Sequence, residues 1–230
     1  MGIKFRKKDN NDYDAGNIFW VTMSDLMLGL SIVFITLFVL AMTGFTQQAV
    51  QQQKVKMDVA REISQELKKH NIDVKIDNMT GDLVIPSTAL FELNSYVLTP
   101  EGKVLLSKLA PIYINTIFKK KELVEDIDSI LIQGHTDSQT FAGIKSVNEQ
   151  FVRNMDLSLK RANSVASYIL QTGYDKKNSE AFRKMIVVEG KSYNEPVIVN
   201  GHEDYAKSRR VELKIKVKDW SVASVFGLKK

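Results

Sequence analysis

The sequence contains no cysteine, so no disulfide framework can form, and this absence neither supports nor excludes an oxidising compartment. It also lacks a phosphate-binding glycine loop, a paired metal-ligand motif and a recognisable nucleophile and base. These absences argue against the common classes of enzyme. We therefore expect a protein that is not an enzyme and that uses no cofactor.

The charge of the chain shows no concentrated block of one sign. The formal net charge is +5, but the basic residues are scattered among acidic ones. The positive excess includes Lys4, Arg6, Lys7 and Lys8 at the N-terminus and Lys229 and Lys230 at the C-terminus. Direct nucleic-acid binding usually needs a concentrated basic patch, so we do not expect a nucleic-acid partner.

Charge is almost absent from the apolar run at 18–45, which contains Asp25 as its only formally charged residue. The run exceeds the ~20 residues that cross a hydrocarbon core of ~30 Å. It therefore predicts a transmembrane helix. A cleaved signal peptide is the alternative, because small residues at 41–44 could form a cleavage site, but the apolar part of a signal usually has only about 7 to 15 residues.

The flanks of this run predict its orientation. A basic leader at 1–17 precedes it, whereas the other flank carries no charge until Lys54. By the positive-inside rule, the N-terminus is expected in the cytoplasm, and the rest of the chain on the outer side of the inner membrane.

Asp25 is the main candidate functional residue of the span. A carboxylate at the centre of a membrane helix costs roughly 2.5 to 3.5 kcal/mol, so it needs a partner or a use. Thr22, Gly29, Thr36 and Thr43 recur every seventh residue and lie within about 60° of Asp25 on a helical wheel. Such a small, hydroxylated stripe is expected to face other protein. A packing stripe with an incidental Asp is the alternative.

Residues 46–70 form a glutamine-rich segment with one weak apolar face. The apolar residues at helical spacing are Val55, Val59, Ala60, Ile63 and Leu67. This pattern predicts a helical linker that either pairs with a second copy or docks on the following domain. A solvated linker is the third possibility.

A globular domain is expected at 71–220, followed by a tail at 221–230. The pattern predicts a hairpin with its turn at 78–81, and a helix that Thr99 caps and Pro100 starts. The further predicted elements are strands at 127–133, 185–188 and 211–217 and a helix at 157–170. Their order indicates an α+β fold in which the domain is an α/β sandwich, with helices on one sheet.

Four stretches of this domain resemble the OmpA family of peptidoglycan-binding domains. They are Phe91–Ser95 with Leu98–Gly102, Gly134–Asp137, Asn154–Ala162 and Arg209–Glu212. A domain of this kind behind one span with Trp20, Ser24 and Asp25 is similar to the B subunits of ion-driven stator-type motors. These are the flagellar MotB family and the ZorB-type subunits of Zorya anti-phage systems.

The resemblance implies a binding site for the diaminopimelate stem peptide of peptidoglycan. In the family, an Asp and an Arg that match Asp137 and Arg161 hold the zwitterionic end of diaminopimelate. A carboxylate for the ammonium and a guanidinium for the carboxylate suit a zwitterion. Thr136, Asn154 and Arg209 in the same motifs complete the expected site. The alternative is an Asp137–Arg161 ion pair that only ties a loop to a helix.

The sequence departs from the family pattern in three places. Thr140–Arg153 lengthens the spacing between Asp137 and Arg161, and it could cap, reshape or replace the pocket. Ser208 stands where Asn is common, and Tyr205 where Arg is common. His135 is expected to be a turn or core residue rather than a ligand.

The resemblance also implies a mechanism and partners. Two copies of the B subunit would form a homodimer inside a pentameric multi-span A subunit of the ZorA/MotA kind, anchored to peptidoglycan. Asp25 would carry the ion beside Thr22, Gly29 and Thr36. A proton is favoured over sodium, because a sodium site needs several oxygen ligands. We expect a ZorB-like role in phage defence, with a flagellar MotB-like stator subunit or a passive OmpA-like envelope tether as alternatives.

Overall fold

The computed structural model describes residues 11–72, 74–77, 80–119, 121–172 and 174–218. The first ten residues of the expected leader and the expected tail at 221–230 lie outside the described residues. The chain divides into two compact units, Met1–Val50 and Gln51–Lys230, which are described separately.

The described part of the first unit is helical. Helix α1 (Asn11–Lys69) begins in it, and Asn17–Gly44 is long and apolar enough to cross a membrane. The Thr22 and Thr36 hydroxyls donate to carbonyls of their own helix, at 3.0 Å to Ile18 O and 2.7 Å to Ile32 O. Their hydrogen atoms are therefore satisfied without water, as an apolar medium requires.

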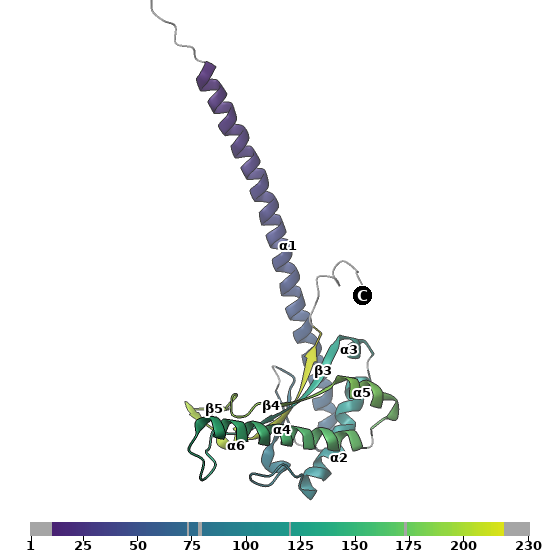
Figure 1. Cartoon of the computed structure of the whole chain (residues 1–230). Helices are drawn as coiled ribbons and strands as arrows, with labels where there is room; N and C mark the ends of the chain where they lie inside the picture. Colours follow the sequence, from purple (N-terminus) through teal and green to yellow (C-terminus); the bar gives the residue numbers. More distant parts are fainter. Residues whose placement is uncertain (1–10, 73, 78–79, 120, 173, 219–230) are drawn as a thin grey trace, which may run out of the picture. The chain divides into compact units, whose positions relative to one another are not determined.

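The second unit is built on a mixed five-stranded sheet (Figure 1). The strand order is β1 (Lys75–Ile76), β2 (Leu83–Pro86), β7 (Arg210–Val217), β3 (Ile127–His135) and β4 (Ile186–Gly190). β3 and β4 are parallel, and the other neighbouring pairs are antiparallel. The β1–β2 pairing confirms the predicted hairpin, although residues 78–79 of its turn lie outside the described residues.

The sheet has one apolar and one polar face. Ile130 and Ile132 of β3 pair with Ile215 and Leu213 of β7, and all four are buried. Alternating with the apolar positions, β7 carries Arg210, Glu212, Lys214 and Lys216. Because successive side chains of a strand point to opposite faces, the apolar set meets the helices and the charged set forms the other face.

Two helices and the end of α1 complete the core. α2 (Pro100–Phe118) starts as predicted, because the Thr99 hydroxyl accepts a hydrogen bond from Gly102 N at 3.0 Å. α4 (Val147–Gln171) packs on β3 and β4, and crosses in front of them in Figure 1. In α1, the predicted apolar face, Val59, Ile63 and Leu67, is at most 2% exposed and belongs to this core. This part of α1 therefore docks on the domain.

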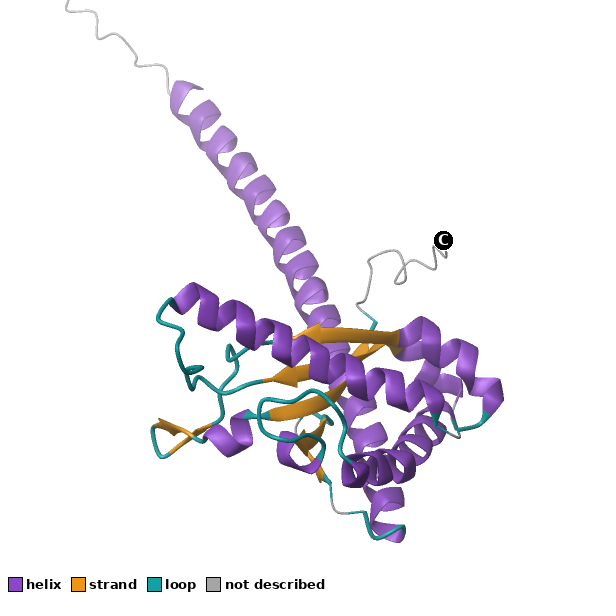
Figure 2. Cartoon of the chain, turned by 60° about the horizontal axis from the view of Figure 1, so that its bottom comes forward, coloured by secondary structure: helices purple, strands orange, loops and turns teal. Residues whose placement is uncertain are grey.

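Some predicted boundaries were wrong. α4 begins at Val147 instead of 157, where Ser146 caps it. The prediction missed its first turns because the face that they bury is polar instead of apolar. β4 begins one residue late, because Met185 ends α5 (Ser179–Met185). Several short elements had no prediction: η1 (Ser87–Ala89), α3 (Lys121–Asp126), η2 (Lys176–Asn178), α5, β5 (Ile198–Val199), β6 (His202–Glu203) and α6 (Tyr205–Ser208). β5 and β6 form a hairpin apart from the main sheet (Figure 2).

Candidate binding site

A cavity of about 290 Å³ lies beyond the carboxyl end of β3. It is lined by Leu93, Asn94, Thr136, Asp137, Gln139, Thr140, Phe141, Ala142, Asn154, Leu157, Arg161 and Arg209. The structure thus brings together all five residues that were predicted to bind peptidoglycan, from the end of β3, from α4 and from the start of β7.

A close approach of β3 and α4 builds the floor of this cavity. A Cβ atom on Gly134 would lie 2.0 Å from Ser158 O, so only glycine lets the strand and helix pack at this distance. Asn154 and Arg161 are seven residues apart on α4 and therefore share one face of the helix. Both side chains reach the cavity for this reason.

Thr136 is fixed by the neighbouring loop after β4. Its N–H donates to Ser192 O at 2.9 Å, and Ser192 N–H donates to the Ser158 hydroxyl at 3.1 Å. Thr136 is only 3% exposed, and its hydroxyl has no hydrogen-bond partner among the described residues. A buried polar group without a partner is costly, so this hydroxyl keeps an unused hydrogen-bonding capacity in a residue that lines the cavity.

Asp137 pairs with Arg209, and not with Arg161 as one interpretation of the sequence had it. Arg209 Nη1 donates to Asp137 Oδ2 and also to Gln139 Oε1, the latter at 3.3 Å. The reason is the sheet register, which places Arg210 opposite His135 and so brings Arg209 beside the end of β3. Within the described residues, Arg161 forms no ion pair. The alternative in which an Asp137–Arg161 ion pair joins the loop to the helix is therefore wrong for the described residues.

Arg161 is buried and held by the 91–98 loop. Its Nε donates to Ser95 O at 2.9 Å, and its guanidinium lies 5.5 Å from the centre of the Phe91 ring. Burial, reinforced by the charge of Arg209 and opposed by that of Asp137, lowers the pKa of Arg161 to about 10. It is therefore still charged at neutral pH. Its Nη atoms donate to no other described residue and are free to bind a ligand.

The cavity combines two guanidinium groups with one carboxylate, so its side chains carry a net positive charge. A ligand with both an amine and a carboxylate fits this set, because Asp137 can accept from the ammonium while the guanidinium groups donate to the carboxylate. Leu93, Phe141, Ala142 and Leu157 supply apolar walls around these polar groups. The arrangement thus suits a zwitterion on an aliphatic stem.

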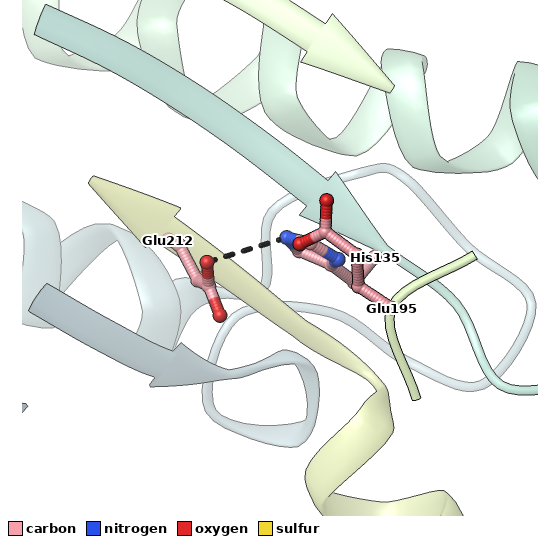
Figure 3. Close-up of side chains that lie close together, drawn as sticks. All are labelled: His135, Glu195 and Glu212. Carbon is pink, nitrogen blue, oxygen red and sulfur yellow. Dashed lines mark ion pairs between the residues drawn. The ribbon is translucent and has the colours of Figure 1, made fainter. Parts of the chain in front are cut away.

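A second group of titratable residues lies on the polar face of the sheet (Figure 3). The ligand atoms of His135, Glu195 and Glu212 lie within 4.8 Å of one another, and His135 is fully buried, as its expected core position requires. Burial would raise the pKa of Glu212, but His135, Lys214 and Arg210 outweigh it and hold this pKa well below its usual range. Because two permanent cations already neutralise Glu212, the cluster is best described as an ion-pair network.

The sequence did not identify Gln150, Phe141 or Ser95 as site residues. Gln150 lies four residues before Asn154 on the same face of α4, so extending the helical period toward the N-terminus would have found it. Ser95 acts through its backbone carbonyl, and no residue pattern reveals such a contact. Ser208, which departs from the family pattern, accepts a hydrogen bond from Val197 N at 3.0 Å.

Comparison with known families identifies the family of the domain. The model of the OmpA family matches residues 90–210, which is more than half of the chain. The chain therefore belongs to the OmpA family, and within it resembles ZorB proteins.

Two relatives are similar over nearly the whole chain. Zorya protein ZorB from one Escherichia coli strain is 29% identical, with 94% of this chain and 92% of the relative covered. Zorya protein ZorB from a second Escherichia coli strain is 25% identical, with 100% of this chain and 87% of the relative covered. A solved MotB-like protein from Desulfovibrio vulgaris has the same fold, with a TM-score of 0.51, 20% identity, and 75% of this chain and 97% of that chain covered.

Proposed function

We propose that the chain is the peptidoglycan-anchored B subunit of an ion-driven membrane motor in anti-phage defence. The observation that carries this proposal is the cavity in which Asp137, Arg161, Thr136, Asn154 and Arg209 meet. Similarity to two ZorB proteins over nearly the full chain supports the defence role. The single apolar segment of α1 supports a single-pass protein of the inner membrane.

The proposed anchor works by exchange of ion pairs. Before binding, Asp137 is neutralised by Arg209. The ammonium of the diaminopimelate end takes the place of Arg209 on Asp137, and the released guanidinium joins Arg161 in binding the carboxylate. The unpartnered Thr136 hydroxyl and the Asn154 amide supply further hydrogen bonds. Charge-assisted hydrogen bonds on both ends of a zwitterion give affinity and orientation together.

Sedimentation with purified peptidoglycan sacculi tests the anchor. The Asp137→Asn variant is expected to remain in the supernatant while the full-length wild-type chain sediments. Asp156→Asn is the matched control, because Asp156 is an exposed carboxylate on α4 that pairs with Lys160 and does not line the cavity. Sedimentation of the Asp137→Asn variant at the wild-type level would refute the anchor.

Asp25 carries the ion in the proposed motor, with Thr22, Gly29 and Thr36 on the same face. Neutralising this carboxylate with a proton removes the cost of its charge in the membrane, which couples ion occupancy to helix contacts. One elementary charge that crosses 100 mV releases ~2.3 kcal/mol, which is enough to drive a step. The partners in this proposal are a second copy of the chain and a pentameric multi-span A subunit. The N-terminus is cytoplasmic and the domain periplasmic.

A passive wall tether is the second candidate, because the cavity supports wall binding whatever the role of Asp25. In a tether, the apolar segment is only an anchor and Asp25 is dispensable. A flagellar MotB-like stator would need Asp25, as the motor in phage defence does. The two are distinguished by whether a substitution of Asp25 impairs motility or protection against phage. The full-length ZorB relatives favour defence over both.

A further inference from the structure

The loop at 139–145 forms one wall of the cavity. Its residues Gln139, Thr140, Phe141 and Ala142 all line the cavity, as do Leu93 and Asn94 of the 91–98 loop. This wall belongs to the stretch that lengthens the chain between Asp137 and Arg161. The inserted residues therefore extend the site and leave its polar floor in place.

One side chain holds this wall. Gln150 on α4 is only 6% exposed and uses its whole carboxamide on the loop backbone. Phe141 N–H donates to Gln150 Oε1 at 2.8 Å, and Gln150 Nε2 donates to Phe141 O at 3.0 Å and to Ile144 O at 2.9 Å. Three hydrogen bonds from a buried, helix-anchored amide give the loop one defined position.

The wall differs chemically from the floor. Its contribution at Phe141 and Ala142 is apolar, and Leu93 and Leu157 add apolar surface. The floor, with Asp137, Arg161 and Arg209, can bind the charged groups of a ligand. It does not distinguish ligands by the group to which those charges are attached. A wall of this kind recognises the aliphatic stem between the zwitterionic end and the peptide.

We propose that Gln150 is a positioning residue that fixes the 139–145 loop so that Phe141 and Ala142 form an apolar wall, and that the site thereby selects a zwitterion borne on an aliphatic stem. This proposal rests on the proposed wall-binding function and deepens it. Gln150 does not touch the ligand; it acts through the position of Phe141. Because the loop is already ordered before the ligand binds, binding does not have to include the loss of conformational entropy that ordering the loop would cost.

A double-mutant cycle tests this role. Binding of a soluble stem peptide that contains meso-diaminopimelate is measured by calorimetry with the full-length chain in detergent. Gln150→Leu keeps the size of the side chain and removes the three hydrogen bonds. Phe141→Ala removes the wall and leaves these bonds, because they are made to backbone atoms. Each single variant is expected to weaken binding by about tenfold, within the range for residues that act together.

The two substitutions are expected to be non-additive. In the Phe141→Ala background, Gln150→Leu should change the affinity by less than about twofold, because the wall that it positions is already lost. A purely structural role for Gln150 would weaken binding equally in both backgrounds. Asn148→Leu is the matched control, since it removes an exposed carboxamide from the same end of α4, and it should bind as the wild type does.

The outcomes separate this inference from the proposed function. Wild-type affinity in the Gln150→Leu variant, or full additivity with Phe141→Ala, overturns the positioning role and leaves the anchor intact. If the wild-type chain does not bind the peptide, or if Asp137→Asn binds it equally well, the wall-binding function is overturned and the inference with it. If Gln150→Leu does not fold, an unchanged affinity in Phe141→Ala still overturns the proposed wall.

Discussion

At the scale of single residues, a substitution of Thr136 is expected to affect ligand affinity and the free energy of unfolding differently. Its hydroxyl is buried without a partner among the described residues, so it costs the fold free energy that a hydrogen bond to a ligand would recover. Thr136→Val is nearly isosteric. We expect the free energy of unfolding to stay constant or rise by up to about 1 kcal/mol, while the affinity for the stem peptide falls about fivefold, the worth of one hydrogen bond.

Thermal unfolding and calorimetric titration of the same preparation check this prediction. A loss of stability without any loss of affinity would mean that the hydroxyl serves the fold and not the ligand.

Glu212 makes the stability of the domain depend on pH. Its pKa lies below the ordinary value of 4.5, so its contribution is fully present above pH 4.5 and is lost as the pH falls toward the pKa of the folded state. Glu212→Gln leaves the buried Arg210 without its carboxylate and takes from Lys214 its nearest one, at 2.7 Å, and should cost roughly 3 kcal/mol at neutral pH. The difference in unfolding free energy between wild type and variant should shrink in acid.

Unfolding at a series of pH values measures this difference. Exposed pairs such as Lys184 with Glu180 give the control, since Glu180→Gln should cost little at any pH. If the difference in unfolding free energy between wild type and Glu212→Gln grew as the pH fell, the lowered pKa of Glu212 would be contradicted.

At the scale of helices and strands, the contact of β3 with α4 decides where the site residues lie. A Cβ on Gly134 would overlap Ser158 O at 2.0 Å, and neither backbone can yield without moving Arg161 and Asn154. We expect Gly134→Ala to lower Tm by roughly 10 °C, from overpacking of about 3 kcal/mol.

Gly143→Ala is the matched glycine control. It has open space around its Cβ position and only a positive φ of 82° to disfavour alanine, so it should cost about 1 kcal/mol. Equal Tm values for the two variants would show that the contact between strand and helix is not close.

The sequence predicted the elements whose signals are local. Thr99 followed by Pro100 located the start of α2, and the alternation along 211–217 located β7, because capping and burial on one face leave periodic patterns. The β5–β6 hairpin was missed although Asn200 and Gly201, both at positive φ, are a strong turn signal. The first turns of α4 were missed because they are polar and one buried amide, Gln150, replaces an apolar stripe.

The sequence predicted which residues gather around the cavity, but not which of them pair. The family motifs identify Asp137, Arg161 and Arg209 as site residues. They cannot say that Asp137 pairs with Arg209, since that depends on the register of β7 against β3. Long-range register is set by the packing of the whole sheet, and no local pattern contains it.

At the scale of the whole molecule, the two proposed functions, ion carriage by Asp25 and wall binding by the domain, can be tested independently by substitution. Asp25→Asn removes the carboxylate that is proposed to carry the ion, and should leave the domain unchanged. In cells that carry the complete defence system, we expect this variant to bind sacculi and its A subunit as the wild type does, and to give no protection against phage. Asp156→Asn is the control. Phage protection by the Asp25→Asn variant would favour the passive tether.

The central claim, that the cavity grips the zwitterionic end of diaminopimelate, has one direct test. The full-length chain in detergent is titrated with two stem peptides that differ only in carrying meso-diaminopimelate or lysine. Lysine keeps the amine for Asp137 and lacks the carboxylate for Arg161 and Arg209. We predict that the diaminopimelate peptide binds and that the lysine peptide binds at least about a hundredfold more weakly, because the buried guanidinium of Arg161 is left without a carboxylate. Equal affinities for the two peptides would contradict the account.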